Sequence, residues 1–151
     1  MSYTTFDELE NFEFGQAYVG NVEIRQGIFH MVFDNVLIKP ENSRNRDIRT
    51  MRCNEMLVTI ENPEITEVLE EGFKEYDANG KLMRAIPDRL VEESEYPYVW
   101  EQLLEGEVYS VVVDRAEKSY QLIIDSPNYR TYRITLNGTK DTEDWERFLN
   151  L

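Results

Sequence analysis

The amino-acid sequence predicts a mostly β fold, in which antiparallel strands form a barrel or a sandwich accompanied by two or three short helices. Apolar residues recur with a period of two through most of the chain, and short turn-forming stretches separate the segments that have this pattern. No segment between them is long enough to be the crossover helix that parallel strands require. An α+β fold, with the helices on one face of an antiparallel sheet, is the alternative. The length of 151 residues fits one β-rich domain over residues 1–151.

The first expected element is a short helix over residues 4–12. A threonine can cap it, acidic residues occupy its first turn, and Phe6, Leu9 and Phe12 recur at spacings of three. The sequence therefore predicts a helix that lies on the core.

Two strands are expected within residues 18–38, joined by a turn at residues 26–27. The second strand places Phe29, Met31 and Phe33 on one face and further apolar side chains on the other. Because both of its faces are apolar, we expect this strand to be central in the sheet.

A further strand is expected over residues 51–60, followed by a hairpin over residues 73–86 with its tip at Asp77 to Gly80. The acidic residues near this tip also match the first positions of a calcium-binding loop. The twelfth position of such a loop requires a glutamate but is occupied by Ile86, which favours a plain hairpin.

A second helix is expected over residues 94–106. Ser94 can cap it, Pro97 is tolerated in its first turn, and Gly106 ends the apolar pattern. Three strands should follow, at residues 107–114, 119–125 and 129–138.

A third helix is expected over residues 141–151. Asp141 can cap it, and Trp145, Phe148 and Leu149 form an apolar stripe at helical spacing. We expect this helix to pack on the core, because the stripe would otherwise lie in water.

The chain contains one histidine, His30, and one cysteine, Cys53, which limits the chemistry it can perform. They cannot supply the three or four ligands of a zinc site, and no nucleotide-binding or hydrolase motif accompanies them. Carboxylates could hold magnesium or manganese, but thirty acidic residues form close pairs by chance. We therefore expect no catalytic residue, no metal and no cofactor. The simplest interpretation of His30 is a hydrogen-bonded or partly exposed strand residue, and that of Cys53 is a buried, unreactive thiol.

Thirty acidic and sixteen basic residues give the chain a net charge of −14, a field that opposes binding to nucleic acid. The start of the sequence has no basic and apolar leader. No stretch approaches the roughly 18 consecutive apolar residues of a membrane helix. We therefore expect a cytoplasmic protein that binds neither nucleic acid nor membranes.

One segment, RNRDIRTMRCN at residues 44–54, departs from this acidic character because it holds Arg44, Arg46, Arg49 and Arg52. The favoured interpretation is that these arginines form ion pairs with the protein's own carboxylates. The alternative is a binding site for a small anion. In an extended segment Arg44, Arg46 and Arg52 point to one side and Arg49 to the other, so at most three could converge on one ligand.

These observations favour a non-enzymatic binding protein whose acidic surface meets a basic protein partner. The small, acidic and β-rich character resembles that of bacterial immunity proteins that neutralise basic nuclease toxins, a likeness of composition that carries over no motif and no residue. The second hypothesis is a protein that binds a small apolar or anionic molecule, in a pocket inside a β-barrel or between sheet and helix, with an arginine-lined anion site at residues 44–52. An enzyme that uses carboxylates, tyrosine and arginine ranks last.

Overall fold

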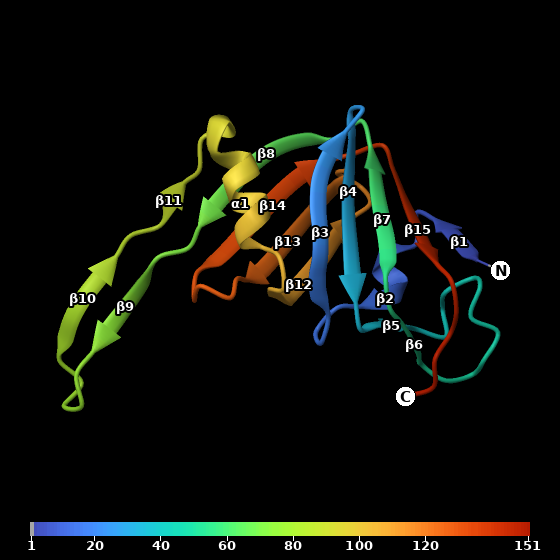
Figure 1. Ribbon diagram of the computed structural model, residues 1–151, viewed down its shortest axis with the longest axis horizontal. Helices are drawn as coiled ribbons and strands as arrows, with labels where there is room; N and C mark the ends of the chain where they lie inside the picture. The colour runs from blue at the N-terminus through green and yellow to red at the C-terminus, as the bar shows by residue number, and fades with distance from the viewer. Residues whose placement is uncertain (1) are drawn as a thin grey trace.

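The structure, a computed structural model that describes residues 2–151, is built around one ten-stranded antiparallel sheet (Figure 1). The strand order is β1-β15-β7-β4-β3-β12-β13-β14-β8-β11. In that order the strands span Tyr3–Phe6, Lys140–Trp145, Met56–Glu61, Ile28–Asp34, Tyr18–Arg25, Glu107–Asp114, Ser119–Asp125, Thr131–Asn137, Glu64–Glu70 and Arg89–Leu90. Each neighbouring pair is antiparallel.

Two small sheets and a few helical turns complete the fold. A projecting hairpin consists of β9 (Phe73–Tyr76) and β10 (Leu82–Ile86). A three-stranded sheet consists of β2 (Phe12–Glu13), β5 (Val36–Ile38) and β6 (Met51–Cys53). The helical elements are the 3-10 turns η1 (Leu9–Asn11) and η2 (Glu93–Glu95) and the α-helix α1 (Tyr96–Gln102). Over residues 2–151, no helix has the length and apolar character needed to cross a membrane.

The large sheet turns back on itself between β3 and β12, which gives a sandwich-like arrangement. These two strands pair only at Tyr18 and Glu107, and beyond this point they diverge (Figure 1). One buried cluster contains side chains from both halves, among them Phe29 on β4, Leu122 on β13 and Ile134 on β14. The end strands β1 and β11 do not pair with each other in the described chain, so the sheet is open and the barrel alternative is not realised.

Most of the predicted strands are confirmed. β3 and β4 are joined at Gln26 and Gly27, which both have positive φ, at 54° and 71°. β4 is interior, between β3 and β7, and its Phe29, Met31 and Phe33 side chains are buried as the period of two predicted. β12 and β13 have the predicted bounds, and β14 lies within the predicted third strand.

The predicted helix over residues 4–12 is wrong. Residues 3–6 form β1, which pairs with β15, and only Leu9–Asn11 form a helical turn. Asp7 has a φ of 54°, a left-handed conformation that no α-helix contains. The Thr5 hydroxyl donates to Glu143 at 2.8 Å, a long-range contact that favours the strand and that no local pattern reveals.

The predicted helix over residues 141–151 is also wrong, because β15 occupies its first half. Asp141, Glu143 and Trp145 alternate inward along this strand. Two of these three inward residues are acidic, so the sequence shows no alternation of apolar residues that would predict a strand here. The expectation that this segment packs on the core is confirmed for Trp145, which is buried.

The strand predicted over residues 51–60 is divided into β6 and β7, which belong to different sheets. The division falls at Glu55, which has a left-handed φ of 52°. The helix predicted over residues 94–106 is confirmed in its centre, where η2 leads into α1.

We expect Trp145 to contribute strongly to stability, because its buried ring packs against the rings of Tyr3, Phe12 and Phe148. The substitution Trp145→Ala should lower the free energy of unfolding by about 3–5 kcal/mol, measured by urea denaturation. The control Tyr109→Ala removes a ring that is 69% exposed and should change it by less than about 0.5 kcal/mol. Coincident unfolding curves for Trp145→Ala and the parent chain would contradict the assignment of Trp145 to the cooperative core.

Candidate functional site

A groove of about 520 Å³ between β3 and α1 is the candidate functional site. Four consecutive residues of β3, at positions 21–24, line one side of it. The opposite side consists of Glu93, Tyr96, Pro97, Trp100, Glu101 and Leu104. The ring of Trp100 packs edge-on against Phe29 with 6.0 Å between the centroids, which fixes this wall to the core.

The groove follows the open edge of β3. Successive side chains of a strand point to opposite faces, so four consecutive residues line one groove only when it runs along the strand edge. Backbone hydrogen bonds join Val19 to Glu105 and Gly106, near the start of β3. In the described chain, no strand continues this pairing along residues 21–25. On this side, residues 21–25 therefore have no partner strand in the described chain.

The groove combines acidic and apolar side chains. Glu23, Glu93 and Glu101 line it, whereas no lysine or arginine does so among residues 2–151. Glu23 forms an ion pair with Arg25. Glu93 and Glu101 form no ion pair with any residue among residues 2–151. Ile24 and Leu104 are 47% and 38% exposed and add apolar surface. An occupant with both cationic and apolar side chains would complement this lining.

The four arginines predicted as a ligand site lie in different environments. Arg44 and Arg46 line one cavity of about 470 Å³. Arg49 points elsewhere, with its Nε 3.4 Å from Asp47, and Arg52 lies on β6. The alternation expected for an extended segment does not apply to Arg44, Arg46 and Arg49, because residues 44–50 form turns and bends rather than a strand. Arg52 does not join the first two arginines at the cavity, because a turn-rich loop precedes β6 and interrupts the alternation.

Internal ion pairing, the favoured interpretation of these arginines, is confirmed for Arg49 alone. Over residues 2–151, Arg44, Arg46 and Arg52 form no ion pair with a carboxylate. For these three residues the expectation of internal pairing is wrong. Three of the four arginines of this segment therefore have no carboxylate at ion-pair distance among residues 2–151.

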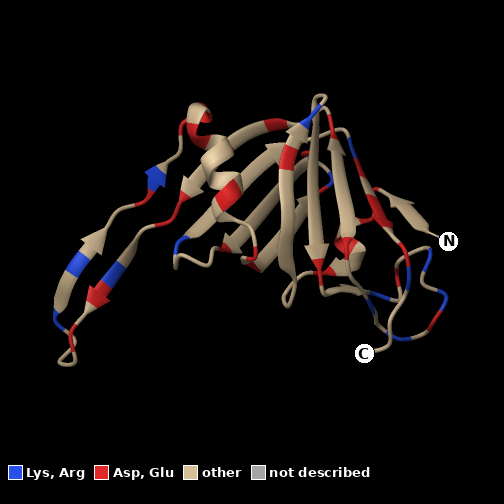
Figure 2. Cartoon of the chain, in the orientation of Figure 1, with Lys and Arg blue, Asp and Glu red and all other residues tan. Residues whose placement is uncertain are grey.

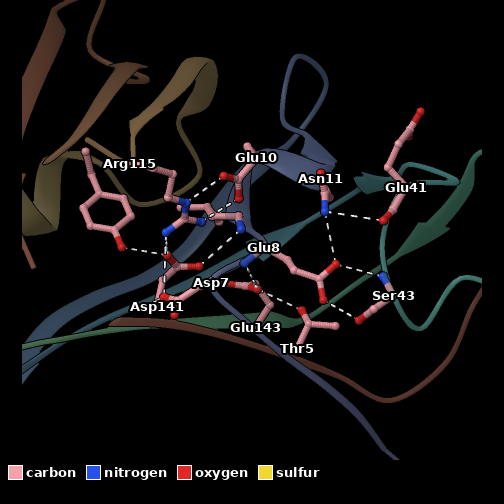
Figure 3. Close-up of polar contacts among 12 residues, drawn as sticks. Thr5, Asp7, Glu8, Glu10, Asn11, Glu41, Ser43, Arg115, Asp141 and Glu143 are labelled. Atoms are coloured by element: carbon pink, nitrogen blue, oxygen red, sulfur yellow. Dashed lines mark hydrogen bonds and ion pairs between the residues drawn. The ribbon is translucent and has the colours of Figure 1, made fainter. Parts of the chain in front are cut away.

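A second cluster of polar groups joins β15 to the N-terminal segment (Figure 3). Its centre is Asp141 and Glu143, which are both 0% exposed. Asp141 accepts hydrogen bonds from the Arg115 guanidinium, the Tyr120 hydroxyl and the Leu9 N–H, and Glu143 accepts from the Thr5 hydroxyl and the Glu8 N–H. These hydrogen bonds hold β15 against the N-terminal segment.

The two buried carboxyl groups carry a single negative charge at neutral pH. Burial, together with the hydrogen bond to Asp141 and its charge, raises the pKa of Glu143 to about 10. Burial acts in the same direction on Asp141, but the hydrogen bonds from Glu143, Arg115 and Tyr120 outweigh it and hold the pKa of Asp141 below its usual value. Glu143 is therefore protonated and Asp141 ionised.

The cluster extends outward to the loop that carries the arginines. Arg115 bridges Asp141 and Glu10, with N–O distances of 2.6 and 2.5 Å, and its hydrogen bond lowers the pKa of Glu10. The carboxylate of Glu8 accepts a 2.8 Å hydrogen bond from the backbone N–H of Ser43 and another from the Ser43 hydroxyl. The buried pair is thus connected through Glu8 to residues 43–49.

The sequence also singled out His30, Cys53 and the hairpin tip at Asp77 as candidates for chemistry. His30 is half-buried on β4, as expected, and its Nδ1 has no hydrogen-bond partner in the described chain. Cys53 is buried, and burial, followed by the charge of Asp34, raises its pKa to about 12, so the thiol is unreactive as expected. Asp77 accepts two backbone hydrogen bonds of 2.9 Å within the tip of the β9–β10 hairpin, which confirms the hairpin interpretation. No group of three or more His, Cys, Asp or Glu side chains within residues 2–151 is arranged to hold a metal ion.

Sequence reasoning missed both the groove and the buried carboxyl pair. The groove joins residues 21–24 to residues 93–104, and no local pattern relates segments so distant in the chain. The carboxyl pair had a signal, because Asp141, Glu143 and Trp145 follow the period of a strand directly after a turn. Carboxylates at strand positions ordinarily face water, however, and this hides such a signal.

The substitution Glu143→Gln should reduce the pH dependence of stability. Folded Glu143 keeps its proton, whereas the unfolded carboxyl group ionises above about pH 4.3. The folded state then binds more protons, so the free energy of unfolding of the parent chain should fall as pH rises from about 5 toward 10. Glutamine stays neutral, and the fall should be smaller in the variant. Urea titrations at about pH 5, 6.5 and 8 measure this difference, and parallel pH profiles for the two chains would contradict a protonated Glu143.

The substitution Asp141→Asn should remove a contribution to stability that depends on pH in the opposite direction to that of Glu143. Because its folded pKa is lowered, Asp141 stabilises the fold above the ordinary aspartate pKa of about 3.9, and this contribution is lost as pH falls through the folded value. At pH 7 the variant should lose about 1–3 kcal/mol of unfolding free energy. Asp144→Asn, on the outward face of the same strand, is the control and should lose less than about 1 kcal/mol. Equal losses in the two variants would contradict an ionised Asp141.

No protein-family model, no curated protein and no solved structure matches this chain. Its function is therefore inferred from its own residues and their geometry.

Proposed function

We propose that the chain is a non-enzymatic binding protein whose acidic groove holds an extended, basic segment of a protein partner. The observation that supports this function is the open edge of β3 beside Glu93 and Glu101, two carboxylates with no ion pair in residues 2–151. The net charge of −14 would attract a basic partner and speed its encounter with the groove, most strongly at low ionic strength.

The segment would add to the large sheet as a further strand beside β3. Backbone hydrogen bonds to residues 21–25 would supply affinity that does not depend on the partner's sequence. Because strand side chains alternate, every second side chain of the segment would face α1 and the others would point away. The groove would therefore select the residues at every second position of the segment rather than a continuous sequence motif.

The groove lining favours lysine or arginine at the positions that face α1. The cationic ends would lie near Glu93 and Glu101, and the aliphatic stems would lie over Trp100 and Leu104. Exposed ion pairs contribute about 0–1 kcal/mol each, so the charges would determine selectivity and association rate more than affinity.

A designed peptide tests this function. A labelled hexapeptide of alternating lysine and valine should bind saturably in fluorescence anisotropy, and binding should weaken with added salt. The double variant Glu93→Gln/Glu101→Gln should bind it about tenfold more weakly. The same peptide methylated on alternate backbone nitrogens should bind poorly, because it cannot complete the hydrogen bonds of a strand.

Two controls separate the groove from the general acidity of the chain. Glu64→Gln/Glu117→Gln removes two exposed carboxylates outside the groove and should leave peptide affinity nearly unchanged. A peptide with glutamate in place of lysine should not bind. Equal weakening by the two double variants, or equal binding of the methylated peptide, would contradict strand addition at β3.

A further inference from the structure

The arginines of this chain fall into two groups. Seven form ion pairs, namely Arg25, Arg49, Arg84, Arg89, Arg115, Arg130 and Arg133. Arg44, Arg46, Arg52 and Arg147 form none within residues 2–151. In a chain with thirty acidic residues, an arginine without a carboxylate partner is the exception and needs an explanation.

The unpaired arginines lie at one corner of the molecule. Three belong to residues 44–52, and Arg147 lies just after β15 in a segment that bridges to β6. Arg52 and Leu149 exchange two backbone hydrogen bonds of 2.9 and 2.7 Å across this bridge. Figure 2 shows the resulting concentration of basic segments on the loops beside the C-terminus.

The cavity of about 470 Å³ at this corner has an apolar part and a cationic rim. Its lining consists of Tyr3, Met51 and Phe148 together with Arg44, Asn45, Arg46 and Asp47. The rings of Tyr3 and Phe148 meet edge to face at 4.7 Å, and the Arg44 guanidinium lies 5.5 Å from the centre of the Tyr3 ring. Asp47 forms its ion pair with Arg49 and not with Arg44 or Arg46.

The loop that carries the rim is held in one conformation by a buried asparagine. The side-chain amide of Asn45 donates to the carbonyls of Ile38, Lys39 and Arg49, each at 3.2 Å. Its oxygen accepts from the Asp47 N–H at 3.0 Å. Arg44 and Arg46 flank this anchored residue, so less conformational freedom is lost when they bind a ligand.

We propose that this corner binds a small organic anion, with a carboxylate or phosphate group between Arg44 and Arg46 and an apolar or aromatic body against Tyr3, Met51 and Phe148. Guanidinium groups recognise both oxyanions through paired hydrogen bonds, so the shared chemistry is an oxyanion on an apolar body. The overall negative charge does not prevent binding. At physiological ionic strength exposed charges are screened beyond about 8 Å, so the local arginines dominate the potential.

Thermal unfolding with four probes tests the proposal. Phenyl phosphate and benzoate present the two oxyanions on an aromatic body, inorganic phosphate lacks the body, and benzamide lacks the charge. At least one of the two aromatic anions should raise the melting temperature saturably, by about 5 °C near saturation, and benzamide should not. A shift by inorganic phosphate that equals the larger aromatic shift would overturn the role of the apolar lining. The absence of a saturable shift with either aromatic anion would overturn the site.

Matched variants locate the effect. Arg44→Gln/Arg46→Gln should abolish the ligand-induced shift and lower the unliganded melting temperature by only a few degrees, because neither arginine forms an ion pair and only the contact of Arg44 with the Tyr3 ring is lost. Arg25→Gln/Arg84→Gln removes the same charge elsewhere and should retain the shift. Arg44→Lys/Arg46→Lys keeps the charge, loses the planar fork and should reduce the shift, which provides a readout if the glutamine variant does not fold. Retention of the full shift in both substituted forms of the corner would overturn the proposal.

Discussion

The fold depends on burying two neighbouring carboxyl groups, Asp141 and Glu143, on the inward face of β15. A buried carboxyl group is tolerated only when hydrogen bonds satisfy it, and the partners of this pair come from β1, η1, β13 and the turn after β12. These contacts place the N-terminal segment against the sheet. Glu8, which lies in that segment, then holds Ser43 and with it the loop that presents Arg44 and Arg46. One buried pair thus organises an edge of the sheet and a distant surface.

The acidic groove has a different physical origin, in the bend of the large sheet. A sheet that turns back on itself must separate two neighbouring strands, and here β3 and β12 separate after one pair. The separation leaves a strand edge open, which ordinarily invites pairing between copies of a protein. Glutamates beside this edge repel a second acidic copy and attract a basic segment. In the proposed function the same charges would oppose self-association and select a basic segment.

Charge is distributed so that two surfaces of opposite sign occupy opposite ends of one half of the sheet. The groove follows β3, whereas the arginine corner lies beyond β15 and β1, at the other end of the order β1-β15-β7-β4-β3. Each arginine outside this corner forms an ion pair with a carboxylate of the protein itself. Screening over about 8 Å reduces the electrostatic coupling between the two surfaces, so the proposed anion site and the proposed basic-segment groove would be compatible in a chain of −14.

The sequence by itself determined the β class, most strands, the hairpins and the central helix, because these follow from period, turn residues and caps within a few neighbouring positions. It also singled out residues 44–52 as a run of arginines in an acidic chain. Only the tertiary structure decided that residues 3–6 and 140–145 are strands, since their pairing brings donors near the start of the chain to two buried carboxyl groups near its end. It alone brought β3 beside α1 and left Arg44 and Arg46 unpaired. Burial and long-range pairing reverse local preferences there, because satisfying a buried polar group outweighs the few tenths of a kcal/mol of helix propensity at each residue.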